Sequence, residues 1–502
     1  MMLERIESLY QLFKKEILLE QNAEKQLLKI QELIHFCWMN YPLRFSDADL
    51  ENCIQKNIIS WDNIKLYPNQ NTIVHVASTL FEVGGHTRWL MNCIDHLSEY
   101  KHTIVLTRQS KNIPQNVLDF VNEKKINIVR IPSEFSLMQK VNSLKEILME
   151  LQPFKVFSFH HSDDLISVLA TTGSAHFQSI LFNHSDHIYS LGARFFDLQI
   201  DFRRTGSMIS KLGKSVSQFS IQVLPLSKEN RELENNTFKE QFQSYDFVVG
   251  TLTNVSKVQS FLKSETILDV IFKLANEHKN SLFLIIGLEA KQAEKLSEKK
   301  MPENVHCLGI ISDPNQYYGV MDFFLEPFPI GSGLGIIEAC QYGAIPIFGK
   351  HPVKLCSTFE VFHEKVRSMF NPDLVHLSQN DQLKFYLQKS DSDRQQFKSE
   401  LKNAIQSHHR GANWTASLKL MEKFKTEKQD FENEEWLKEE ASFFHNHQMK
   451  TSQDLLTYLL GLKHLVNRKI LVKIITSYKF KLSIKALTAA NRGRFIHRLI
   501  YG

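Results

Sequence analysis

The stretch EPFPIGSGLGIIEACQYGAIPIFG (326–349) has the composition of a phosphate-binding turn. Glycines at positions 331, 333 and 335 follow an apolar run, and a helix is predicted to open near Gly335. Free backbone N–H groups at such a helix start attract an anion, and the helix dipole contributes about 0.3–1 kcal/mol. Glu338, expected on the first turn, could reach the ribose of a nucleotide bound there. The alternative is that the glycines only serve a tight turn between strand and helix.

A second glycine-rich turn lies in VASTLFEVGGHTRWLMN (76–92), where Gly84 and Gly85 separate a predicted strand from an apolar helix. Ligands of parallel sheets bind beyond the carboxyl ends of the strands, so turns of this type in two domains would face one cleft. Neither turn spells G-x-G-x-x-G or G-x-x-x-x-G-K-[ST]. The two turns therefore lack the motifs that would indicate a dehydrogenase or a P-loop kinase.

Histidines and carboxylates concentrate in FHHSDD (159–164) and in FNHSDHIYSLGARFFDLQIDFRRTG (182–206), each directly after a predicted strand. A histidine with a carboxylate partner can act as a general base because its pKa lies near neutral pH. We expect His184 to be the base and Asp186 to orient it, with His187 or His160 as substitutes. The alternative is that these histidines cap helices and bond to backbone.

Three arginines near the same segments, Arg88, Arg203 and Arg204, could contact phosphates, although isolated arginines more often form surface ion pairs. The spacing H-x-D-H differs from the helical spacing of zinc enzymes, so no metal is expected.

Predicted strands and helices alternate along the chain around these residues. Apolar, often β-branched runs are separated by helical stretches and occur at 72–78, 103–107, 127–131, 155–159 and 178–183. After a polar stretch at 228–245 the alternation resumes, with runs at 246–252, 281–287, 304–309, 322–327 and 344–348. Such alternation predicts an α/β fold with two parallel sheets and crossover helices.

The organisation that follows has four parts. We expect a helical N-terminal extension over 1–66, a first α/β domain over 67–240, a second over 241–428 and a helical basic extension over 429–502. The 502 residues, 43% hydrophobic and 23% charged, are ordinary for globular domains. Six cysteines without a C-x-x-C pair favour a reducing compartment.

Charge is distributed unevenly. Residues 455–502 hold ten Lys/Arg and no acidic residue, so the +5 of the whole chain leaves −5 for residues 1–454. Apolar residues at helical spacing in the tail, flanked by lysines, favour contact with an anionic membrane surface or packing on the protein's own domains. Nucleic acid is not expected as a partner, because the body is acidic and the tail has few aromatic residues.

The N-terminus carries Glu4 and Glu7 where a signal peptide would be basic, and no run approaches the roughly 18–20 apolar residues of a spanning helix. We therefore expect a cytoplasmic protein, peripheral at the inner face of the plasma membrane if the tail binds lipid.

Several segments together resemble the GT-B glycosyltransferases, which have two facing Rossmann-like domains and a nucleotide-sugar in the cleft. The similarity extends over about 70–430 and rests on four segments: the Gly84–Gly85 turn, VVGTLTNVSKV (248–258), NVHCLG (304–309) and GSGLGIIEACQYGAIPIF. The resemblance implies that the second domain binds the donor.

By this resemblance, Lys257 would lie beside the diphosphate, Gly331 and the run Gly333, Leu334 and Gly335 at the phosphates, and Glu338 at the ribose, with Gly84 and Gly85 facing them. One feature departs from the pattern. Retaining members usually show E-x7-E, whereas the residue eight positions before Glu338 is Ile330.

The resemblance implies transfer of a sugar from a nucleotide-sugar to a hydroxyl group of a glycan, a lipid-linked carrier or a protein, in cell-envelope or surface glycan synthesis. No cofactor is expected, since the nucleotide-sugar is a substrate. Two alternatives stay open: a non-hydrolysing nucleotide-sugar epimerase, and a catalytically idle GT-B scaffold that assists another transferase.

Overall fold

The computed structural model describes residues 2–40, 44–62, 64–227, 240–258, 265–328, 330–349 and 357–410. The predicted basic extension, with its expected membrane contact, and most of the predicted linker at 228–245 lie outside these residues.

The first domain is built on a seven-stranded sheet in which all strands are parallel. The strands are β1 (Asn69–Ala77), β2 (Lys101–Leu106), β3 (Asn127–Arg130), β4 (Pro153–Phe159), β5 (Gln178–Phe182), β6 (Leu198–Asp201) and β7 (Phe219–Ile221). Their order is β3-β2-β1-β4-β5-β6-β7, so the chain changes direction across the sheet between β1 and β4. The five predicted strands are confirmed, and β6 and β7 extend the sheet beyond them.

Helices cover both faces of this sheet. The main ones are α4 (Gly85–His96), α5 (Gln115–Glu123), α6 (Leu137–Leu151) and α7 (Leu165–Thr171), with the short α8 (Arg204–Met208) after β6. Alternate residues of β1 enter different cores: Ile73 packs with Trp89 of α4, whereas Val74 packs with Leu144 of α6. A strand with apolar residues on both faces needs cover on both sides, which the crossover helices provide.

The second domain repeats the arrangement with five parallel strands in the order β10-β9-β8-β11-β12. They are β8 (Val248–Leu252), β9 (Leu282–Ile286), β10 (Val305–Gly309), β11 (Phe323–Leu325) and β12 (Ile345–Ile347), all within predicted runs. The helices are α10 (Val255–Val258), α11 (Ile267–Glu277), α12 (Ala290–Ser297), α13 (Asn315–Tyr318), α14 (Gly333–Gln341), α15 (Glu364–Arg367), α16 (Pro372–Val375), α17 (Gln379–Leu387) and α18 (Asp391–His409).

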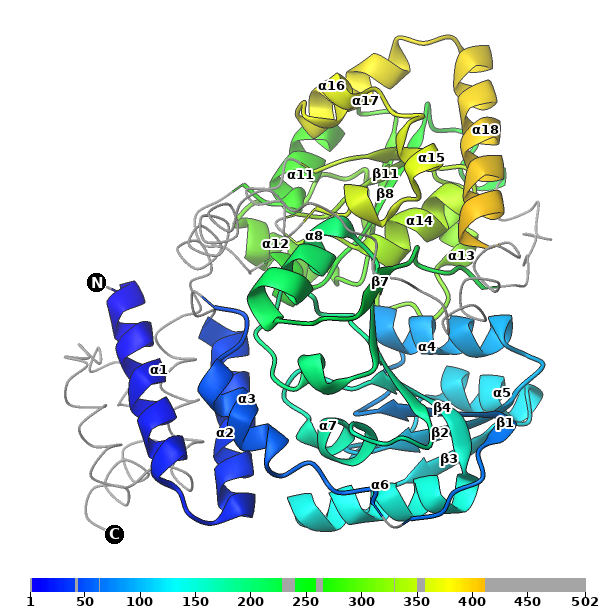
Figure 1. Cartoon of the computed structure of the whole chain (residues 1–502). Helices are drawn as coiled ribbons and strands as arrows, with labels where there is room; N and C mark the ends of the chain where they lie inside the picture. Colours follow the sequence, from blue (N-terminus) through cyan, green and yellow to red (C-terminus); the bar gives the residue numbers. More distant parts are fainter. Residues whose placement is uncertain are drawn as a thin grey trace.

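Three helices precede the first sheet, in the region predicted to be helical: α1 (Met2–Leu19), α2 (Ala23–Asn40) and α3 (Ala48–Gln55), which stand beside the first domain (Figure 1). Both carboxylate oxygens of Glu51 accept the N–H of Gly192, at 3.1 and 3.0 Å. The Tyr10 and Tyr189 hydroxyls lie 3.1 Å apart. The N-terminal helices therefore contact and stabilise the segment after β5. This segment contains His184, the predicted base.

The last described helix ties the second domain back to the connection between the domains. The carbonyl of His409, at the end of α18, accepts the N–H of Leu226 at 2.7 Å, and its ring Nδ1 lies 3.1 Å from the carbonyl of Leu224. On the other side of this connection, Asn92 of α4 donates to the carbonyl of Pro225 at 2.9 Å. Figure 1 shows α18 descending toward α4 of the first domain.

Candidate active site

The candidate site residues follow the central strands of the two sheets. In the second domain the direction of strand order changes between β8 and β11, and the segments after these strands hold Lys257 and the 331–335 glycine turn. In the first domain it changes between β1 and β4, after which come Gly84–Gly85 and the 160–164 loop. Open α/β sheets bind ligands at such points, because the neighbouring loops diverge there and leave a crevice.

Lys257 lies against the glycine turn, although 74 residues separate the two in the chain. Its ammonium group donates to the carbonyl of Gly331 at 3.0 Å, and the side chain of Asn254 accepts its backbone N–H at 3.0 Å. Burial lowers the pKa of Lys257 to about 8, against the opposing effect of the Glu326 carboxylate. The ammonium group is therefore mostly charged at pH 7, and it is held at the edge of the turn.

The helix after the turn starts earlier than predicted. α14 begins at Gly333, so Glu338 lies on its second turn and not on its first. The side chain of the N-cap residue, Ser332, makes no capping hydrogen bond, so it does not occupy the first N–H groups of α14. Gly333 and Gly335 do not have positive φ angles. A Cβ at Gly335 would lie 3.2 Å from Ser332 Oγ and 3.4 Å from the Tyr318 hydroxyl, so close packing favours glycine there.

Glu338 joins the two domains. Its Oε2 accepts from Nη1 of Arg88 on α4 at 2.6 Å, and Asp313 lies 4.0 Å from the same guanidinium group. Burial raises the pKa of Glu338, and the charge of Arg88 opposes this rise. The resemblance implies that Glu338 binds a ribose, whereas in this structure Glu338 forms an ion pair between the domains. Arg88, which could have contacted a phosphate, contacts carboxylates instead.

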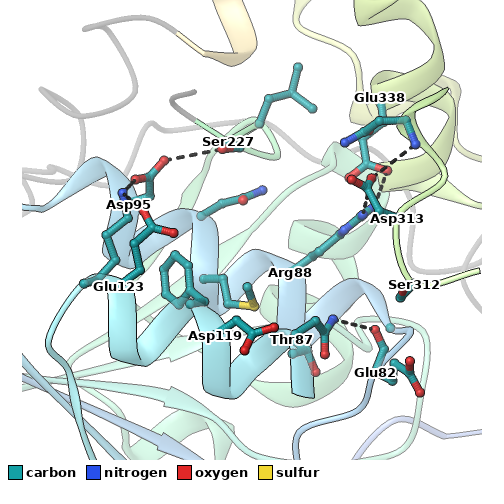
Figure 2. A pocket seen from close by; sticks show the side chains of 18 of the residues that line it. Glu82, Thr87, Arg88, Asp95, Asp119, Glu123, Ser227, Ser312, Asp313 and Glu338 are labelled. Atoms are coloured by element: carbon teal, nitrogen blue, oxygen red, sulfur yellow. Dashed lines mark hydrogen bonds and ion pairs between the residues drawn. The ribbon is translucent and has the colours of Figure 1, made fainter. Parts of the chain in front are cut away.

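A hollow of about 280 Å³ lies beside this ion pair, between α4 and α5 on one side and α13 and α14 on the other. Figure 2 shows Arg88 extending from α4 toward Glu338, with Asp313 beside it and Asp95 and Glu123 farther along the hollow. Small-molecule sites typically enclose roughly 300–1,000 Å³. At about 280 Å³ the hollow is slightly smaller than that range.

Substitutions Arg88→Met and Glu338→Gln test the ion pair. Each is expected to lower the free energy of unfolding by about 1–2 kcal/mol, less than for a fully buried pair because the Arg88 side chain is 30% exposed. In the double variant, the loss in free energy of unfolding should be smaller than the sum of the two single losses by at least about 0.5 kcal/mol. The reason is that the second substitution removes a side chain that is already unpaired. Urea unfolding of the four proteins measures this coupling. Strictly additive losses would show that the pair does not form in solution.

Histidines from three strand ends meet on the first-domain side. The ring of His184, after β5, stacks on that of His86, from the start of α4, with centroids 5.2 Å apart, and lies 6.2 Å from that of His161, after β4. Phe81 stacks on His161 at 5.9 Å. Sequence reasoning missed His86 and His161 as site residues. His86 directly follows the two glycines of the first turn, and His161 is the second residue of an HH pair in which only His160 was predicted.

His184, the histidine predicted to be the base, differs from His160 and His187 in its hydrogen bonding. Its Nδ1 is buried without a hydrogen-bond partner among the described residues, and burial lowers its pKa well below the ordinary value. The pKa of His161 is lowered to about 4, and that of His86 is lowered too, both by burial. All three rings are therefore neutral at pH 7, the state that a general base requires.

The other predicted catalytic residues have different partners. Asp186 does not orient His184: its carboxylate pairs with both Nε and Nη2 of Arg203 and lies 3.2 Å from Nδ1 of His187. The Arg203 charge helps to hold the pKa of Asp186 far below its usual range, in spite of complete burial. His160 is inside the domain, with Nδ1 2.7 Å from the Ser158 hydroxyl. In the structure, Asp186, His187 and His160 thus contact partners other than His184, and their catalytic roles stay predictions.

Arg203 is also not a free phosphate ligand. Besides Asp186, it reaches the second domain, where Nη1 donates to the carbonyl of Ser357 at 3.2 Å. Beside it, the N–H of Thr205 donates to the Glu360 carboxylate at 2.8 Å. Like the Arg88–Glu338 pair, these contacts cross from one domain to the other.

Glu326, four residues too early for the E-x7-E pattern, is fully buried and binds backbone. Its carboxylate accepts the N–H groups of Gly349 and Thr358 at 2.8 and 2.7 Å. The carboxylate therefore shapes the loops after β11 and β12.

Within the described ranges, no three His, Cys, Asp or Glu side chains converge closely enough to hold a metal ion, the histidines around His184 included. Among the helices of the same residues, none has the length and hydrophobicity that crossing a bilayer requires.

Solved structures share this architecture, whereas no protein-family model and no curated protein matches the sequence. A glycosyltransferase from Rickettsia africae ESF-5 aligns with a TM-score of 0.52 at 12% identity, over 70% of this chain and 97% of that one. A variant of the O-GlcNAc transferase of Thermobaculum terrenum aligns with 0.50 at 11% identity, over 82% and 79%. Sucrose-phosphate synthase of Thermosynechococcus elongatus aligns with 0.50 at 10% identity, over 70% and 98%.

The chain therefore has the GT-B fold, with two Rossmann-like domains whose parallel sheets face a common cleft. The expected fold class is confirmed.

Proposed function

We propose that this protein is a glycosyltransferase that moves a sugar from a nucleotide-sugar donor to a hydroxyl group of an acceptor. The observation that supports the proposal is that each of the two sheets carries one candidate site at the ends of its central strands. A charged Lys257 on a glycine turn lies at the centre of the second sheet, and a neutral histidine cluster lies at the centre of the first. The names of the similar structures, a glycosyltransferase and an O-GlcNAc transferase, support sugar transfer.

In this mechanism the donor diphosphate binds at Lys257 and the first turn of α14. Negative charge grows on the leaving diphosphate as the bond to the anomeric carbon breaks. A fixed ammonium group and free N–H groups stabilise that charge because they are oriented before the reaction begins. His184 accepts the proton of the attacking hydroxyl. Glu338 binds the ribose after its ion pair with Arg88 has broken.

The acceptor belongs to the first domain in this proposal, and it is a glycan, a lipid-linked carrier or a protein involved in surface glycan synthesis. The nucleotide-sugar is a substrate, so the reaction needs no cofactor. The site we propose for chemistry comprises His184 with its neighbours His86 and His161, and on the donor side Lys257 and the 331–335 turn.

A panel of nucleotide-sugars tested for thermal stabilisation of the full chain examines this function. A donor present at 100 times its dissociation constant is expected to add about 2.7 kcal/mol to the stability of the folded state. The stabilising donor is then incubated with and without acceptor preparations, and the sugar products are analysed. Conversion of the donor sugar without any acceptor would indicate an epimerase instead. Absence of stabilisation by every donor would support an idle scaffold.

A further inference from the structure

A second cavity, larger than the hollow beside Arg88, lies between the N-terminal extension and the first domain. It measures about 550 Å³ and is formed by α2, the start of α6 and the loop after β2. This volume is within the range typical of small-molecule sites. The donor-binding residues are in the other domain, so the proposed transfer leaves this cavity unassigned.

Positive charge dominates the lining. Lys25, Arg108 and Lys140 face the cavity, and Glu24 is the one acidic residue among them. The Glu24 carboxylate accepts the N–H of Met138 at 3.1 Å, at the beginning of α6. Hydrogen bonds from Ser136 and from this backbone lower the pKa of Glu24, so its charge is already compensated.

The three cations differ in the partners that they contact. Arg108 pairs with Asp163, its Nη1 lying 3.2 Å from Oδ1. By contrast, the ammonium groups of Lys25 and Lys140 make no hydrogen bond or ion pair within the part of the chain that the structure describes. Burial lowers the pKa of Lys140, the charges of Asp164 and Glu134 oppose this change, and the charge of Arg108 adds to it. An anion placed here would pair with the ammonium groups of Lys25 and Lys140.

The rim of the cavity is apolar. Leu28 of α2 is 36% exposed and Phe135, just before α6, is 37% exposed, and both line the cavity. A ligand that combines an anionic group with an apolar part would cover these side chains and also pair with the lysines.

The cavity adjoins the proposed active site through a shared loop. Asp163, the partner of Arg108, lies two residues after His161, whose ring belongs to the histidine cluster. Arg108 follows β2 and Asp163 follows β4, so both lie at the same edge of the first sheet as His184.

We infer that the cavity between α2 and α6 is an acceptor subsite for the phosphate-bearing, partly apolar end of the acceptor, held by Lys25 and Lys140. This inference rests on the proposed glycosyl transfer and specifies its acceptor. It also assigns a function to the N-terminal helices, because α2 supplies one wall of the cavity and one of the two lysines.

Calorimetric titration of the full chain with n-octyl phosphate, in the absence of any nucleotide, tests the inference. We expect saturable binding that becomes roughly ten- to hundred-fold weaker in the double variant Lys25→Met/Lys140→Met, the usual effect of losing charge-assisted contacts. Lys140→Arg, which keeps the charge, should retain binding close to that of the wild type. Lys15→Met, an exposed lysine on α1, is the matched control and should bind as the wild type does.

Equal affinity of the wild type and the double lysine variant would overturn the subsite. Equal affinity for 1-octanol would show that the anion is not recognised, and equal affinity for inorganic phosphate would show that the apolar rim is not used. Either result would also overturn the inference as stated. This titration contains no donor, so its outcome tests the acceptor subsite alone. The proposed transfer is tested separately, by nucleotide binding that depends on Lys257.

Discussion

Replacement of His184 by glutamine is expected to lower the transfer rate by roughly 10²–10⁴-fold, the usual cost of losing a general base. The ring belongs to the first domain, and its Nδ1 has no hydrogen-bond partner among the described residues. Donor affinity should therefore be unchanged, because the residues that we assign to the nucleotide belong to the other domain. Glutamine keeps a polar side chain of similar size, so the stack with His86 is disturbed as little as possible.

The pH profile separates a base from a merely structural histidine. Burial lowers the pKa of His184, so the neutral, competent ring persists as pH falls through 6.5 and is lost only at lower pH. The acid limb of kcat/KM should accordingly lie below pH 6.5. His306→Gln, an exposed histidine on β10, is the control and should behave as the wild type. A wild-type rate in His184→Gln would exclude His184 as the base, and an acid limb above 6.5 would argue against a buried histidine.

Replacement of Lys257 by methionine is the second large effect that we expect. It should reduce kcat by roughly 10²–10³-fold, as is typical when one preorganised group that stabilises transition-state charge is removed. Nucleoside diphosphate binding should weaken as well, because the ammonium group is held at the glycine turn by the Gly331 carbonyl before any ligand arrives. Methionine keeps an unbranched apolar side chain and removes the ammonium group with its charge and hydrogen bonds.

The charge of Lys257 also predicts a basic limb. Its pKa is lowered to about 8, so the free enzyme loses this positive charge as pH rises through 8, and diphosphate binding should weaken over that interval. Calorimetry with a nucleoside diphosphate between pH 7 and 9 measures this change. Lys295→Met on α12, an exposed lysine of the same domain, serves as control. If Lys257→Met binds the diphosphate as tightly as the wild type at every pH, the donor site must lie elsewhere.

Local sequence patterns determine much of the architecture of this protein. Apolar runs such as 72–78 and 281–287 become central strands because both of their faces are apolar and need cover on both sides. The strand-to-helix turns at Gly84–Gly85 and at 331–335 could be recognised for the same reason, since a tight turn between two apolar elements is a local property. The resemblance to the GT-B fold rests on these local features, and the structure confirms it.

The short strands β6 and β7 were not predicted. With four residues in β6 and three in β7, each is too short to show a period. They form because neighbouring strands offer them hydrogen-bond partners, which is a property of the assembled sheet.

The choice of partner among charged groups depended on tertiary structure alone. Asp186 was expected to orient His184, two residues away, but it pairs with Arg203, 17 residues later. Arg88 and Glu338 are 250 residues apart and meet only because the two domains face each other. A buried carboxylate pairs with the cation that lies beside it in the folded protein, and that cation can be far away in the sequence.

The two parallel sheets, the glycine turns at their ends and the types of residue that follow the central strands could be predicted from local patterns. These features depend on periodicity and turn chemistry within about ten residues. The tertiary structure was needed to show that His86 and His161 join His184 and that Glu338 bridges the domains. It alone also showed that α2 helps to enclose a cavity with Lys25 and Lys140. The physical reason is that side chains from separate elements meet according to how helices and sheets pack, which no local pattern specifies.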